Sequence, residues 1–102
     1  MRLIVALLPT KERVYGGLLD LERAGYRDRL SWLAEALDQE DTARDRLVGF
    51  LRANGIESVD LLPALEAEVE QRDLYPLVDG HPNRDGYRVI AEVINQYLDS
   101  AH

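Results

Sequence analysis

The stretch Leu3-Ile4-Val5-Ala6-Leu7-Leu8, followed by Pro9, decides the fold class. Its six apolar residues do not alternate with polar ones, which is typical of a parallel strand with both faces covered by helices. Pro9 ends the strand because proline has no amide hydrogen to give to a neighbouring strand. A second apolar-rich run, Ile56–Leu62, follows the turn pair Asn54-Gly55 and precedes Pro63, and it indicates a second strand.

Between the two strands, apolar residues recur at the spacing of an α-helix. Leu30, Leu33, Ala34 and Leu37 predict one helix. Thr42 is the expected N-cap of another helix, which ends near Asn54. Trp32, Phe50 and Tyr97 are the aromatic residues expected to serve the core.

Two more helices are expected after the second strand. Leu65 and Val69 indicate a short helix before Asp73. Asn83 is the expected N-cap of a final helix. The apolar stripe of that helix consists of Val89, Ile90, Val93, Ile94, Tyr97 and Leu98.

This order of elements predicts an α/β fold with about two parallel strands and four or so helices, in a single domain over residues 1–102. Two strands make a small sheet whose edges stay open. One interpretation is therefore a non-catalytic module that self-associates, as a possible homodimer, through its exposed sheet edge.

Composition excludes several classes of function. Asp and Glu outnumber Lys and Arg by 19 to 12, for a net charge of −7, which argues against a nucleic-acid partner. The chain has no Cys, so disulfides, thiolate metal sites and thiol nucleophiles are excluded. The longest apolar run is too short to span a membrane, no signal-peptide pattern is visible, and the location stays open. We expect neither a metal nor a cofactor, because no ligand spacing is present.

The loop Leu77–Asn83 holds the strongest candidate for chemistry. Asp79 precedes His81 by two residues, so its carboxylate can reach the imidazole, fix its tautomer and stabilise the imidazolium. Such a pair is half of a nucleophile-activating triad. The alternative is an ordinary surface turn, because Asp79-Gly80 and Pro82-Asn83 are common turn dipeptides.

The string Asp79–Ala91, which reads DGHPNRDGYRVIA, resembles the last block of the SGNH (GDSL-type) hydrolases. Only one residue, Gly80, separates Asp79 from His81, whereas two residues separate the Asp and the His in most of the family. This shorter spacing resembles the branch related to alginate O-acetyltransferases. Leu3–Tyr15, with its Pro-Thr-Lys-Glu, and Ile56–Pro63 resemble earlier parts of that branch. The middle of the chain has no such match.

The resemblance implies a partial flavodoxin-like fold and a Ser-His-Asp site, with His81 as general base and Asp79 as the residue that orients it. Its substrate would be an ester or an acetylated carbohydrate. Lys11 and Asn83 are candidate substrate-binding residues, although Lys11 is more simply explained as a charge at a helix start.

The serine nucleophile implied by the resemblance lies in a Gly-Asp-Ser motif, which this sequence lacks. Ser31, Ser58 and Ser100 are the three serines, and none is expected on an exposed nucleophile turn. We therefore expect the chain to be the C-terminal part of an SGNH-type domain whose early blocks are missing, or a stand-alone remnant, and to be inactive alone. Its partners would be the N-terminal part or a second copy, and relatives in this branch are often exported.

Overall fold

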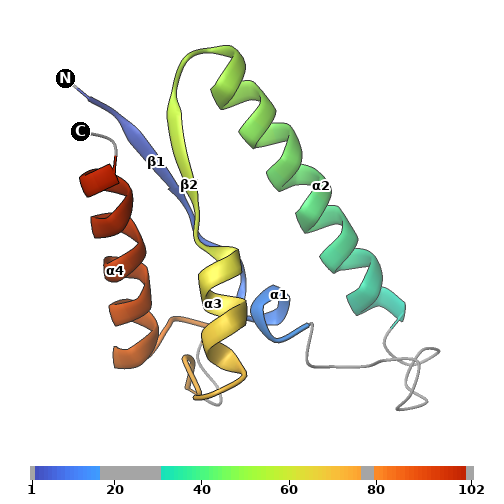
Figure 1. The fold of residues 1–102 in the computed structure, drawn as a ribbon. Helices are drawn as coiled ribbons and strands as arrows, with labels where there is room; N and C mark the ends of the chain where they lie inside the picture. The colour runs from blue at the N-terminus through green and yellow to red at the C-terminus, as the bar shows by residue number, and fades with distance from the viewer. Residues whose placement is uncertain (1, 17–30, 77–79, 101–102) are drawn as a thin grey trace.

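The computed structural model describes residues 2–16, 31–76 and 80–100. The chain forms a small α/β fold around a two-stranded parallel sheet, as predicted. The elements are β1 (Ile4–Leu7), α1 (Lys11–Gly16), α2 (Ser31–Ala53), β2 (Glu57–Asp60), α3 (Leu62–Val69) and α4 (Arg84–Ser100). Figure 1 shows α4 on one side of the strands and α2 on the other, with α1 and α3 beyond the strands' carboxyl ends.

β1 and β2 pair in register from Ile4 opposite Glu57 to Leu7 opposite Asp60. Both strands are shorter than predicted. β2 ends at Asp60 because its Oδ1 accepts a hydrogen bond from Leu62 N at 3.0 Å, which starts α3 at once. Pro63 then sits in the first turn of α3, where proline is tolerated.

The expectation that β1 has both faces buried is wrong. Leu3 is 63% exposed and Leu8 is 55% exposed, and Ala6 within the strand is also exposed. The reason is that Leu3 and Leu8 lie outside the four paired residues, and Ala6 lines an open groove between β1 and α2.

A single continuous helix, α2, replaces the two helices expected between the strands. Thr42 is therefore an interior helix residue and not an N-cap, because no Gly or Pro interrupts the sequence around it. α2 ends at Asn54-Gly55, where Gly55 takes a φ of +69° and Ile56 N bonds to Leu51 O at 2.9 Å. This is the glycine-assisted helix end that Asn54-Gly55 predicts.

The core lies beside the sheet, among α1, α3, α4 and the segment before α4. Leu65 and Leu74 are fully buried in it, and Ile90, Val93 and Ile94 of α4 pack against it, as the predicted stripe requires. Trp32 and Phe50 were expected in the core, but they are 63% and 61% exposed. The buried members of the core are Val14, Leu61, Leu62, Leu65, Val69, Leu74, Tyr75 and Val89.

Ion pairs attach α2 to α1. Arg13 of α1 donates to Asp41 at 2.7 Å, and Arg44 donates to the same carboxylate at 3.0 Å. The hydrogen bond from Arg13 holds the pKa of Asp41 below its ordinary value. Thr10 adds a hydroxyl hydrogen bond of 2.6 Å to Glu40.

Candidate functional site

Asn83 anchors the segment that leads into α4, of which residues 73–76 and 80–83 are described. Its Oδ1 accepts a hydrogen bond from Gly86 N at 3.0 Å, which makes Asn83 the N-cap, as predicted. Its backbone N donates to Leu74 O at 2.7 Å, and its Nδ2 donates to Asp73 O at 3.0 Å. Asn83 therefore ties the start of α4 to residues 73 and 74, and its role as a substrate-binding residue stays a prediction.

Lys11 holds the other end of the same segment. Its Nζ donates to Pro76 O at 2.5 Å, and Lys11 is the first residue of α1, shortly after the carboxyl end of β1. A helix-start lysine with this contact has a clear structural role. Its role in substrate binding stays a prediction.

Tyr15 joins α1 to this segment a second time. Its hydroxyl accepts a hydrogen bond from Leu74 N at 3.3 Å. Its ring meets the ring of Tyr75 edge to face, with 5.9 Å between the centroids. The segment is thus fixed on both sides of residues 77–79, which lie outside the described part of the chain.

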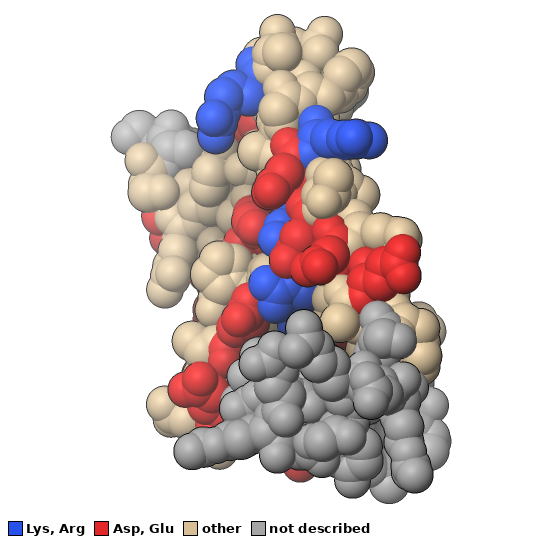
Figure 2. All heavy atoms as spheres, turned by 90° about the vertical axis from the view of Figure 1, so that its right-hand side faces the viewer, with Lys and Arg blue, Asp and Glu red and all other residues tan. Residues whose placement is uncertain are grey.

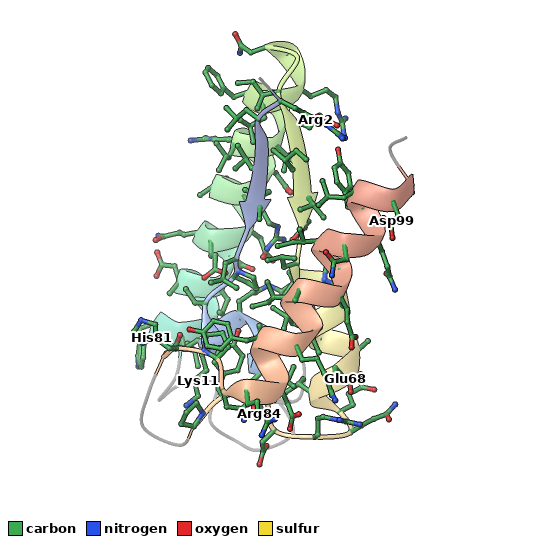
Figure 3. The ribbon with its side chains drawn as sticks, turned by 90° about the vertical axis from the view of Figure 1, so that its left-hand side faces the viewer. Arg2, Lys11, Glu68, His81, Arg84 and Asp99 are labelled. Atoms are coloured by element: carbon green, nitrogen blue, oxygen red, sulfur yellow. The ribbon has the colours of Figure 1, made fainter. Side chains whose placement is uncertain are left out.

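His81 lies between these two anchors. Its side chain is exposed, and the next residue, Pro82, is buried. Figure 3 shows His81, Lys11 and Arg84 at one end of the molecule, with Arg2 and Asp99 at the other. The carboxyl ends of the parallel strands point toward the His81 end, which is where ligands gather in open α/β sheets.

The structure brings His81, Lys11 and Asn83 to this end of the fold. The position of Asp79 lies outside the described residues, so the His81–Asp79 pair stays a prediction. Ser58 lies within β2, and Ser100 ends α4 at the opposite end of the molecule (Figure 1). Neither described side chain is next to His81.

A pocket of about 290 Å³ opens between α1 and residues 73–76, and Tyr75 is part of its lining. Tyr75 is 5% exposed, and its hydroxyl has no hydrogen-bond partner among the described residues. Burial raises the pKa of Tyr75, so the hydroxyl keeps its proton. The pocket is lined by Lys11, Tyr15, Asp73, Tyr75 and Pro76.

Sequence reasoning missed Tyr75. Its only local signal is the Tyr75-Pro76 pair, which marks a turn and says nothing about a buried hydroxyl. The ring of Tyr75 packs against Tyr15 of α1, which is distant in sequence, so its burial has no local signal.

A larger groove of about 450 Å³ runs between β1 and α2, away from His81. It is mostly apolar, and Leu8 and Leu47 lie on its two sides. In the described parts of the chain, no group of three or more His, Asp or Glu side chains is placed so that it could hold a metal ion. No described helix combines the length and apolar character needed to cross a membrane.

No family model matches the chain, and no curated protein or solved structure matches it either. The functional assignment therefore depends on the residues themselves and on the geometry around His81.

Proposed function

We propose that this chain supplies the His–Asp end of a Ser-His-Asp site in an SGNH-type esterase or O-acyltransferase. The observation that carries the proposal is the placement of His81, in a segment held by Lys11 on one side and Asn83 on the other. A general base has to be held in position, because proton transfer depends on hydrogen-bond geometry. The location beyond the carboxyl ends of parallel strands supports a ligand site there.

In the proposed reaction, one imidazole nitrogen of His81 takes the proton from a serine hydroxyl as that oxygen attacks the ester carbonyl. The other nitrogen donates its hydrogen to the carboxylate of Asp79, which keeps the ring in the required tautomer. The imidazolium then returns its proton to the leaving alkoxide as the ester bond breaks. Water or an acceptor hydroxyl repeats these steps on the acyl-serine, which releases an acid or a new ester.

The serine must come from a segment or chain that carries the Gly-Asp-Ser turn, because this sequence has none. We propose the pocket beside Tyr75 as the place where the acyl part of the substrate binds. Tyr75 lines this pocket, and its buried hydroxyl has no hydrogen-bond partner among the described residues.

One test examines the isolated chain with p-nitrophenyl acetate and a serine-directed phosphonate. We expect no phosphonate-sensitive turnover, since members of a triad act as a unit and the nucleophile is missing. Any slow hydrolysis by the imidazole should disappear in His81→Gln and persist in the matched variant His102→Gln. Turnover that the phosphonate abolishes would contradict the proposal that this chain supplies His81 and Asp79 and that the serine comes from elsewhere.

The His81–Asp79 pair is tested by the nitrogen chemical shifts of the imidazole, measured at a pH where histidine is neutral. We expect the tautomer with hydrogen on Nδ1 to dominate, because Asp79 accepts that hydrogen. Asp79→Asn should shift the tautomer populations of His81 and leave those of His102 unchanged. A His81 ring with the tautomer mixture of a free histidine, unaltered by Asp79→Asn, would contradict the pair.

A further inference from the structure

A stripe with large apolar side chains toward its two ends, and Ala, Gln and Arg between them, runs along the exposed face of α2. Phe50 is 61% exposed, Trp32 63% and Leu47 43%. The positions along this face are separated by four and three residues in alternation, which is the spacing of a helix that packs against another helix. They are Trp32, Ala36, Gln39, Ala43, Arg46 and Phe50, with Leu47 beside Arg46.

This stripe is distinct from the face by which α2 joins the rest of the chain. Leu51 is buried, and Asp41 and Arg44 form ion pairs on that inner face. A second apolar stripe on a helix that already has a packed face indicates a second surface to cover.

Charge along α2 indicates which partner fits. Glu35 and Asp38 lie in its first half, and Arg46 and Arg52 lie in its second half, all four exposed. Figure 2 faces the α2 side of the molecule and shows acidic side chains gathered across its middle, with basic ones among them and also at the upper end, where α2 finishes. Within the described residues, neither Glu35 nor Arg46 forms an ion pair, so both charges are available to a partner.

A second copy of this chain matches the pattern when the two α2 helices lie antiparallel. Residue 41 is the midpoint between Trp32 and Phe50, and also between Gln39 and Ala43. A two-fold axis near residue 41 therefore places Trp32 against Phe50 of the other copy at each end, with Gln39 against Ala43 at the centre. The same axis brings Glu35 of each copy within one residue of the position opposite Arg46 of the other, whereas a parallel pair would place like charges together.

We infer that the chain forms a two-fold homodimer through the exposed stripe of α2, with the helices antiparallel and the axis near residue 41. The inference does not depend on the proposed catalytic role. The other open surface, the outer edge of β1, offers only a four-residue strand followed by Pro9, which cannot donate to a ladder.

Sedimentation velocity over a range of chain concentrations tests the dimer. We expect the wild-type chain to dimerise. Glu35→Arg and Arg46→Glu should each raise the dissociation constant by about tenfold or more, because two like-charge contacts replace two ion pairs. The double variant E35R/R46E should recover dimerisation, since the exchanged charges again face opposite ones.

Arg84→Glu on α4 makes the same charge change away from the stripe, and it should leave the dimer intact. Leu3→Glu, just before β1, is the control for the sheet edge, because Leu3 is exposed and does not line the groove beside α2; it should also leave the dimer intact. Circular dichroism of each variant establishes that α2 is folded. A wild-type chain that stays monomeric at all concentrations overturns the inference, and so does a dimer that L3E dissociates and the charge reversals do not.

Cysteine cross-linking tests the orientation, and the chain contains no cysteine of its own to interfere. A mixture of Trp32→Cys and Phe50→Cys chains should form a mixed disulfide dimer on mild oxidation. Each variant alone should cross-link much less, because its thiols lie at opposite ends of the interface. Efficient cross-linking within the pure Phe50→Cys sample would indicate parallel helices and overturn the arrangement.

Discussion

Among the glycines that the structure describes, Gly86 has the least room for a side chain. A Cβ at this position would lie 2.6 Å from the carbonyl oxygen of Leu74 and 2.8 Å from the Cβ of Pro82. The first of these atoms belongs to the backbone that Asn83 also holds. The glycine three residues after Asn83, which contributes to the SGNH resemblance, thus allows the start of α4 to touch the segment before it.

Replacing Gly86 by alanine should destabilise the fold by about 1–3 kcal/mol, because the added methyl group forces the packed segments apart. Gly49→Ala is the matched control, since a Cβ there would meet nothing within 4 Å. That change should stabilise the protein by about 0.5–1 kcal/mol, the ordinary gain from alanine in a helix. Urea unfolding of both variants measures these effects. If Gly86→Ala leaves the free energy of unfolding unchanged, the segment that contacts Gly86 can shift at little cost.

Single residues also mark the limit of sequence reasoning. Asn83 could be predicted as an N-cap because capping is a local hydrogen bond between a side chain and the next turn. Lys11 bonded to Pro76 O and the buried hydroxyl of Tyr75 could not be predicted. Both depend on how α1 meets a segment about 60 residues further along the chain.

At the scale of elements, Glu57 connects β2 to two neighbours. Arg2, just before β1, donates to its carboxylate through two hydrogen bonds of 2.7 Å. The hydroxyl of Tyr97 on α4 donates to the same group at 3.1 Å. The hydrogen bond from Arg2, with help from Tyr97, lowers the pKa of Glu57 from 4.5 to about 2.

A lowered pKa in the folded state gives stability above the unfolded pKa, and this stability is lost as the pH falls. The stability difference between wild type and Glu57→Gln should therefore be constant above about pH 5 and shrink between pH 4.5 and about 2. Urea unfolding at equal chain concentrations across this range measures it. If the stability difference between the two proteins stays constant down to pH 2, the hydrogen bonds of Glu57 with Arg2 and Tyr97 are not the source of the pH dependence.

Helix α4 could be predicted from sequence because its apolar stripe and its cap agree. The break expected at Thr42 was wrong because a cap-type residue carries no information about whether the helix has already begun. Helix α2 is continuous because no Gly or Pro interrupts it around Thr42, and Arg13 of α1 holds Asp41 in the middle of the helix.

For the whole molecule, the apolar run Leu3–Leu8 predicted the α/β class and the parallel pairing. It did not predict that the core would lie beside the sheet, among α1, α3 and α4. The radius of gyration is 15.3 Å, compared with about 13 Å for a compact chain of this length. The extended outline agrees with an α2 that has one face outside the core.

The pairing of Ile4 with Glu57 has a consequence for the time course of folding. The two partners are separated by about 50 residues, and closing such a loop costs about 3–4 kcal/mol before any strand contact forms. The neighbours α3 and α4 meet over a much shorter stretch of chain, so their contacts can form first. The parallel sheet would then be completed after the folding transition state.

Stopped-flow measurements at low chain concentration test this order. Val89→Ala in α4 should slow folding, whereas Val5→Ala in β1 should mainly speed unfolding. A Val5→Ala variant whose whole stability loss appears in the folding rate would contradict the order. If the order holds, the strand with the most apolar sequence is the last to find its partner, so nascent chains expose Leu3–Leu8 longest and are most prone to aggregate through it.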